Sequence, residues 1–245
     1  NQIGIKCHTQ PGDEVICEQE AHVYIYEGGG IAFNSGCQVR ALAGDRGRIQ
    51  AGQVTASINP DDVHKARTSL VCLENTSNRG GGSCYDMEEI KRIRAVCDER
   101  KLKLHLDGAR LFNALVARKE TPSQYGKLFH SISVCFNKGL GCPAGSVLLG
   151  TEPFIGKARR IRKLFGGGMR QTGFLAATAL YALEQHAERL SEDHAHAKQI
   201  AEALLSIPYV KTMLPVETNL IIFELVPGKD PKLFIDQMKA AGILL

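Results

Sequence analysis

Several features that would indicate a membrane or nucleic-acid protein are missing from this 245-residue sequence. No apolar stretch approaches the ~20 residues that a membrane-spanning helix requires, so we expect no membrane association. Lys and Arg never form more than a short run, and the formal net charge of +4 is small and evenly spread. This charge pattern argues against nucleic acid as a partner.

Motifs for metal and nucleotide binding are also missing. The eight cysteines form no Cys-x-x-Cys pair, which argues against a zinc ribbon or a thioredoxin-like motif, and we predict no metal site. Cys17, Cys72 and Cys135 lie in apolar runs that are typical of buried free thiols, so we expect a reducing, cytoplasmic compartment. Neither a Gly-x-x-x-x-Gly-Lys-Ser/Thr loop nor a Gly-x-Gly-x-x-Gly turn after a strand is found, which disfavours a plain nucleotide-binding domain.

Short apolar runs rich in β-branched residues alternate with helical patterns along the chain. Met87, Ile90, Ile93 and Cys97 recur at spacings of three and four, which predicts a helix from about Asp86. This rhythm predicts an α/β fold, a three-layer αβα sandwich with a mostly parallel central sheet. The expected strands are 15–17, 69–73, 102–107, 132–136 and 146–149, and a long helical stretch is expected over 174–205 with a break near Glu192.

The pattern changes near residue 207, where we place a domain boundary. Residues 1–207 would form a large domain, and 208–245 would begin a smaller α/β domain with strands at 210–213 and 219–225 and a helix at 231–241. The sequence starts at Asn1 without Met, inside a predicted helix, and stops at Leu245 in an apolar segment. We therefore expect a piece of a longer chain that lacks the N-terminal part of the large domain and the rest of the small one.

Two residues at predicted strand ends carry the chemistry. Asp107 and Lys138 are 31 positions apart, which leaves room for a helical crossover between adjacent parallel strands. Ligands of open α/β sheets bind beyond the carboxyl ends of the strands. A lysine amine there can form a Schiff base with pyridoxal 5′-phosphate, and a carboxylate can pair with the protonated pyridine nitrogen. Alternatively, the aspartate caps a helix or forms a turn, and the lysine is an ordinary surface residue.

Longer motifs around these residues resemble the threonine aldolase family, which uses pyridoxal 5′-phosphate on the aspartate aminotransferase type of fold. Five motifs occur in the family's order, and together they span nearly the whole chain. They are Glu20–Gly29 (EAHVYIYEGG), Leu73–Thr76 (LENT), His105–Ala114 (HLDGARLFNA), Asn137–Val147 (NKGLGCPAGSV) and Gly166–Gly173 (GGGMRQTG).

The resemblance implies roles around the cofactor ring. Lys138 would carry the cofactor as an internal aldimine, and Asp107 would bind the pyridine nitrogen. His22 would stack on the ring and Ala109 would pack on the opposite face. Arg110 would hold the substrate carboxylate or the cofactor's phenolic oxygen, a task that suits its planar fork.

The resemblance implies further contacts at the rim of the site. Glu74 and Asn75 would line it near the phenolic oxygen, and Ser77 and Tyr26 would contact the substrate. Arg170, in the loop that begins at Gly166, would help to bind the cofactor phosphate of a neighbouring subunit. The family resemblance thus implies a homo-oligomer, a dimer or a tetramer of dimers, with shared active sites.

Two positions depart from the family pattern. Ser77 stands where these aldolases usually have a histidine that acts on the substrate's β-hydroxyl, and Asn137 stands where they usually have serine. Without that imidazole, His22 or a bound water would take over proton transfer. The predicted activity is cleavage of threonine or allo-threonine to glycine and acetaldehyde.

Two alternatives to this activity remain. One is a β-eliminating lyase, or an aldolase for bulkier β-hydroxy amino acids. The other is a non-catalytic homologue of the same fold.

Overall fold

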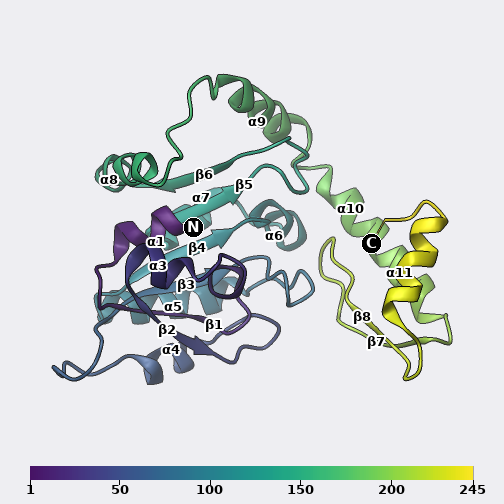
Figure 1. Ribbon diagram of the computed structural model, residues 1–245, viewed down its shortest axis with the longest axis horizontal. Coiled ribbons are helices and arrows are strands. Elements are labelled where there is room, and N and C mark those ends of the chain that lie inside the picture. The colour runs from purple at the N-terminus through teal and green to yellow at the C-terminus, as the bar shows by residue number, and fades with distance from the viewer. Residues whose placement is uncertain (245) are drawn as a thin grey trace.

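Six strands form the central sheet in the order β2-β1-β3-β4-β5-β6, which is parallel except for β6 at one edge. The computed structural model describes residues 1–244. The mostly parallel sheet and its flanking helices confirm the predicted α/β class (Figure 1). The strands are β1 (Glu14–Glu18), β2 (Gln38–Leu42), β3 (Thr68–Glu74), β4 (Lys103–Gly108), β5 (Ser131–Cys135) and β6 (Ser146–Gly150).

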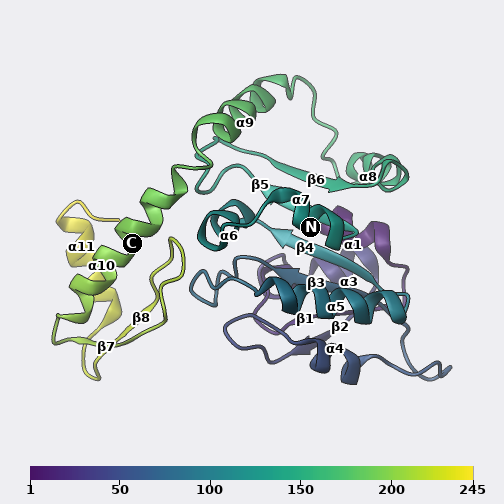
Figure 2. The same ribbon diagram turned by 180° about the vertical axis from the view of Figure 1, so that it is seen from behind.

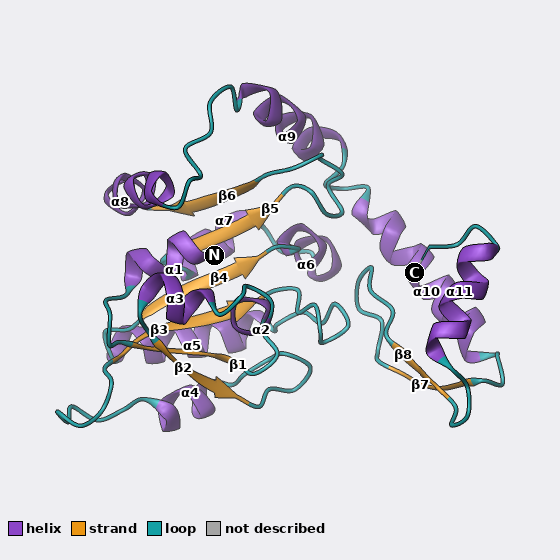
Figure 3. Ribbon diagram, in the orientation of Figure 1, coloured by secondary structure: helices purple, strands orange, loops and turns teal. Residues whose placement is uncertain are grey.

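Helices cover both faces of this sheet, as the two opposite views show (Figures 1 and 2). One face carries α1 (Gln2–His8), α2 (His22–Ile25) and α3 (Gly30–Ser35). The opposite face carries α4 (Ala51–Ser57), α5 (Met87–Glu99), α6 (Leu111–Arg118) and α7 (Pro122–Leu128). Helix α8 (Glu152–Leu164) packs against α1 and β6, and α9 (Gly173–Gln185) lies beyond the β6 edge (Figure 3).

Alternation along the strands builds a separate core on each face. Leu70 and Cys72 pack against α1, α2 and α3, whereas Val71 and Leu73 pack into the larger core with α4 to α7. Because both faces are covered, every residue of β3 is buried, as expected for a parallel strand inside a three-layer domain. The predicted helix at 86 is α5, whose Ile90, Ile93 and Cys97 are all buried.

The C-terminal part begins with α10 (Leu190–Leu205), which packs against α6 and leads to a two-stranded hairpin and a helix. These are β7 (Val210–Met213), β8 (Phe223–Leu225) and α11 (Pro231–Ala240). The predicted domain boundary at 207 falls in the turn between α10 and β7, and it stays a prediction.

Some predicted element bounds were wrong. The break in the long helical stretch lies at 186–189, between α9 and α10, rather than near Glu192. The strand expected over 219–225 is confined to its last three residues. Strand β2 was missed because it lies beside β1 at the sheet edge and its side chains are exposed or half-buried, so it lacks an apolar run.

Among the described residues, no helix has both the length and the apolar character needed to cross a membrane. All eight cysteines are free thiols. Cys17 and Cys72 are buried, as their apolar runs predicted, but Cys135 is only half-buried because it is the last residue of β5.

Candidate active site

Asp107 and Lys138 lie at the carboxyl ends of adjacent parallel strands. Asp107 is the second-last residue of β4 and pairs in register with Ser133 of β5. Lys138 follows the last residue of β5, Cys135, by three positions. The charges of both groups act on the Cys135 thiol, which lies between them in the sequence. Burial raises the pKa of this thiol, the charge of Lys138 partly offsets the rise, and the charge of Asp107 adds to it. The connection between the two strands is helical, through α6 and α7, as predicted.

Asp107 is a buried carboxylate, only 2% exposed. Its Oδ1 accepts a hydrogen bond from the Ala109 backbone N–H at 3.1 Å, and its Oδ2 accepts one from Asn1 Nδ2 at 2.9 Å. Burial raises the pKa of Asp107, and the nearby carboxylate of Glu27 raises it further. A cationic group placed against Asp107 would offset both effects.

His22 begins α2 beside this carboxylate. Its Nδ1 lies 3.3 Å from Glu27 Oε1, and its side chain remains 43% exposed. Its ring centroid is 5.7 Å from that of Tyr26, in a tilted arrangement. Ligand atoms of His22, Glu27 and Asp107 all lie within 4.8 Å of one another, a spacing that a metal ion could use, although Asn1 Nδ2 already donates to both carboxylates.

Glu27 is a member of this group that sequence reasoning missed. Asn1, Gln2 and His22 all form hydrogen bonds with its carboxylate. Its pKa is lowered by these hydrogen bonds, which outweigh the effect of burial. The available signal was its place in the motif 20–29, five residues after His22 and before three glycines.

Glu74, the last residue of β3, joins the site from the other side of Asp107, with which it pairs in register. Its two carboxylate oxygens accept hydrogen bonds from the backbone N–H groups of His22 (3.1 Å) and Asn78 (3.0 Å). Burial, and then the charge of Asp107, raise the pKa of Glu74 to about 7. Glu74 is therefore a carboxyl group that can exchange a proton near neutral pH.

Arg110 directly precedes α6 and is half-buried. Its Nη1 donates to Asn78 Oδ1 at 2.9 Å, so the glycine-rich loop of residues 77–84 holds the guanidinium from one side. The fork keeps other N–H groups for a carboxylate ligand. Asn78 was also missed, because nothing local in the sequence marks it as a partner of Arg110.

The glycines after Lys138 have packing roles that the sequence interpretation did not foresee. Gly139 approaches the neighbouring helix so closely that an added Cβ would lie 2.8 Å from Leu190 Cδ2. Gly141 adopts a left-handed conformation, with φ 76°. Leu140 between them is buried, and its carbonyl accepts a hydrogen bond from the His186 ring at 2.8 Å. Leu140 therefore fixes the backbone just after Lys138, whose own side chain is exposed beyond the end of β5.

Three other predicted site residues lie in different surroundings. Ser77 is buried, and its hydroxyl accepts a hydrogen bond from the Gly80 backbone N–H at 3.2 Å, so a substrate would not reach it in this arrangement. Tyr26 is exposed next to His22. Arg170 is exposed in the loop between α8 and α9, beyond the β6 edge of the sheet (Figure 3). The structure therefore does not join Arg170 to the Asp107 group within one chain.

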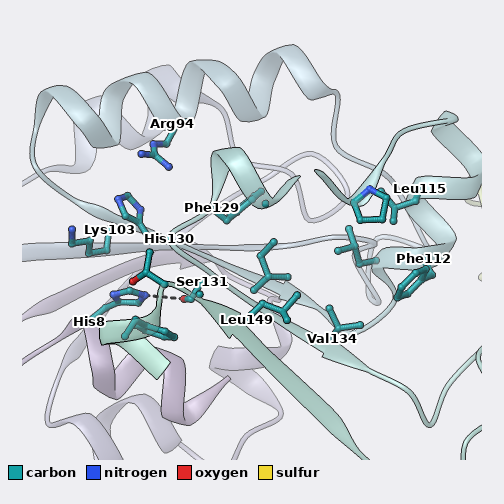
Figure 4. Close-up of a pocket in the computed structure, with 17 residues that line it drawn as sticks. His8, Arg94, Lys103, Phe112, Leu115, Phe129, His130, Ser131, Val134 and Leu149 are labelled. Carbon is teal, nitrogen blue, oxygen red and sulfur yellow. Dashed lines mark hydrogen bonds between the residues drawn. The ribbon is translucent and has the colours of Figure 1, made fainter. Parts of the chain in front are cut away.

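A cavity of about 740 Å³ lies elsewhere, over β5 and β6 and against α6 and α7 (Figure 4). None of the predicted site residues lines it. Its polar groups include His8 and His130, whose pKa values burial lowers to about 3 and about 4, so both imidazoles are neutral at pH 7. The remaining wall is mostly apolar, and this cavity does not carry the chemistry of the strand ends.

The strand-end group suits pyridoxal 5′-phosphate. Burial raises the pKa of Asp107. A protonated pyridine nitrogen beside this carboxylate would stabilise its charged form. Lys138 supplies an accessible amine on the adjacent strand end. A separate cavity of about 300 Å³, which Asn1 and Ser133 border, also carries Arg159 and Arg162, groups that favour an anion such as a phosphate.

Comparison with known proteins gives one matching family and several close relatives. Residues 1–226 match the model of the family described as beta-eliminating lyase. A low specificity L-threonine aldolase of Escherichia coli O157:H7 is 38% identical over 100% of this chain and 72% of its own length. A low-specificity L-threonine aldolase of Candida albicans is 37% identical over 96% of this chain and 64% of its own length. The chain thus spans about two thirds of the length of these relatives.

Solved structures agree on the fold. A threonine aldolase of Leishmania major superposes with a TM-score of 0.79 at 22% identity, covering 91% of this chain and 66% of that protein. An Escherichia coli protein described as having a methionine aminotransferase function superposes with a TM-score of 0.76 at 17% identity, covering 99% of this chain and 65% of the other. At these identities the likeness concerns the fold alone.

Proposed function

The chain belongs to the beta-eliminating lyase family, and from this premise we propose that it is a pyridoxal 5′-phosphate enzyme that cleaves threonine and allo-threonine to glycine and acetaldehyde. The observation that carries the proposal is the position of Asp107 and Lys138 at the carboxyl ends of the adjacent parallel strands β4 and β5. The names of the relatives, low-specificity threonine aldolases, support the choice of substrate.

Each residue has a task in this proposal. Lys138 would hold the cofactor through its amine. Asp107 would pair with the ring nitrogen and keep that nitrogen protonated, and His22 and Ala109 would contact the ring. The bound cofactor supplies an electron sink for the negative charge left at the substrate Cα.

The substrate is held and deprotonated by groups at the rim. The Arg110 guanidinium binds the carboxylate, which turns the Cα–Cβ bond toward the productive orientation. Proton transfer at the β-hydroxyl falls to His22, or to a water, because Ser77 replaces the usual histidine. Glu74, with a pKa of about 7 and a hydrogen bond from the His22 backbone, is placed to hold or release a proton beside them.

The direct test uses the purified protein with added cofactor. We expect a visible absorbance that borohydride abolishes, a reduced adduct that mass spectrometry locates on Lys138, and production of glycine and acetaldehyde from threonine. Lys138→Ala should lose the absorbance and the adduct, whereas Lys127→Ala, on the exposed side of α7, should keep both. An adduct on another lysine would refute the assignment.

The family model favours one second candidate, a β-eliminating lyase that acts at the same site. The products separate the two reactions, because elimination from an amino acid such as serine yields pyruvate and ammonia. If the protein binds the cofactor at Lys138 and releases neither pair of products, the non-catalytic alternative is correct.

We also propose that the protein is a cytoplasmic homo-oligomer, a dimer or a tetramer, with shared active sites. The free thiols suit a reducing compartment. In a shared site, Arg170 would bind the cofactor phosphate of the neighbouring subunit. This would explain why Arg170 lies in the loop between α8 and α9, away from Asp107 of its own chain.

A further inference from the structure

Glu217, in the segment 214–220 that joins β7 to β8, is surrounded by cations from the large sheet domain. Its Oε1 lies 2.7 Å from Arg46 Nη1 and 3.5 Å from Arg48 Nη1, and its Oε2 lies 3.3 Å from Arg118 Nη2. The Cys84 backbone N–H also donates to Oε2, at 3.1 Å. A carboxylate with this many partners, and only 23% exposed, differs from the isolated surface pairs that contribute little.

The same segment packs directly onto the glycine-rich loop 77–84. Thr218 is fully buried, and its hydroxyl donates to the Gly82 carbonyl at 2.8 Å. Gly82 is left-handed, with φ 73°, and an added Cβ there would lie 2.2 Å from Thr218 Oγ1. These close contacts hold together parts of the chain that are 136 positions apart.

Arg46 extends the contact to a third segment, the turn 45–48. It is a non-glycine residue in the left-handed region, with φ 52°, a conformation that needs support from its surroundings. Its side chain donates to the Gly80 carbonyl at 3.2 Å and the Pro215 carbonyl at 2.8 Å, and its own carbonyl accepts from Ser83 Oγ at 2.6 Å. The turn, the loop and the segment 214–220 therefore hold one another.

The glycine-rich loop leads from this cluster to the active site. Asn78, at its start, accepts a hydrogen bond from Arg110 Nη1 and donates its backbone N–H to Glu74 Oε1. Backbone hydrogen bonds from Gly82 N–H to the Ser77 carbonyl (2.9 Å) and from Ser77 N–H to the Ser83 carbonyl (3.0 Å) join the two ends of the loop. The loop 77–84 therefore connects Glu217, which contacts Cys84, to Asn78. A displacement of Glu217 would shift Asn78 through this loop.

We propose that Glu217 is a positioning residue, which fixes the loop 77–84 against the body of the protein and, through Asn78, orients the Arg110 guanidinium for the substrate carboxylate. The proposal rests on the proposed function. It makes the C-terminal part of the chain a contributor to substrate binding without any contact to the substrate.

The variant Glu217→Gln tests this, because it keeps the shape and removes the charge that holds three arginines. We expect KM for threonine to rise roughly fivefold or more with a smaller change in kcat. Hydrogen exchange at the amides of Asn78, Gly82 and Cys84 should become faster. Glu224→Gln, which removes an exposed pair with Lys211 in the same C-terminal part, should change neither quantity.

A double-mutant cycle with Asn78→Ala separates positioning from general damage. If Glu217 acts through Asn78, Glu217→Gln should add little to the KM of the Asn78→Ala protein. Fully additive effects, or unchanged KM and exchange in Glu217→Gln, would overturn the proposal. Failure of the proposed function shows differently, because the wild-type protein would then release no glycine while the exchange of loop amides would still respond to Glu217→Gln.

Discussion

At the residue scale, the site contains two carboxyl groups whose pKa values are raised by burial. Asp107 and Glu74 are adjacent in register at the ends of β4 and β3, and burial raises the pKa of both. Asp107 and Lys138 were singled out from the sequence because each lies near the end of a predicted strand and inside a motif that resembles the threonine aldolase family. Glu27 and Asn78 could not be found in this way, because their partners come from other segments.

Replacing Asp107 with Asn should lower kcat/KM by roughly 10²–10³-fold, because the ring nitrogen loses the charge that keeps it protonated. Steady-state kinetics with saturating cofactor measure this. Asp61→Asn, an exposed loop position, is the matched control and should leave kcat/KM unchanged. Equal activity of the Asp107→Asn and control proteins would remove Asp107 from its assigned role.

Glu74 should make stability depend on pH in the cofactor-free protein. Its folded pKa of about 7 lies above the ordinary value of 4.5, so its neutral form favours folding below pH 4.5. As the pH rises through 7, this contribution is lost, on the order of 3 kcal/mol. Urea unfolding of wild type and Glu74→Gln at a series of pH values should give curves with different slopes over this interval. Parallel curves would contradict the assigned pKa.

At the element scale, the turn 45–48 shows how a connection outside the sheet supports the site. Gly47, with φ 82°, faces the loop 77–84 so closely that an added Cβ would lie 1.9 Å from Ser77 Oγ. Apolar periodicity predicted β1, β3, β4 and β5 correctly, because these strands are buried on both faces. It failed for β2, whose side chains are exposed or half-buried, and it said nothing about this turn.

Gly47→Ala should lower the free energy of unfolding by roughly 2–4 kcal/mol, because it combines backbone strain with overpacking against Ser77. Gly52→Ala is a suitable control, since Gly52 lies in α4 with open space around its Cβ position. The control should be neutral or slightly stabilising. Denaturant unfolding compares the three proteins, and equal losses in both variants would contradict the close packing.

At the scale of the whole molecule, α9 carries large apolar side chains that residues 1–244 leave exposed. Phe174, Leu180 and Tyr181 are 81%, 61% and 61% exposed, and of the helix's residues only Ala182 is buried. An apolar helix face of this kind favours a protein partner. The proposed homo-oligomer places a second copy there.

Leu180→Glu should therefore shift the protein toward the monomer in sedimentation velocity experiments, because a charge in an apolar interface is costly. Val63→Glu, at a position that is 96% exposed in the loop between α4 and β3, should leave the sedimentation coefficient unchanged. Wild-type protein that sediments as a monomer at all concentrations would refute the assembly.

The sequence by itself determined the α/β class, the parallel strands β1, β3, β4 and β5, and the position of Asp107 and Lys138 at strand ends. The strands and the fold class follow from apolar runs that alternate with helical patterns, and the two residues follow from the motifs that surround them. Only the tertiary structure decided the antiparallel β6, the network around Glu27 and the contacts of Glu217 with three distant arginines. These features depend on which distant segments pack together. Such contacts do not change the pattern of apolar residues within either segment, so the sequence alone does not reveal them.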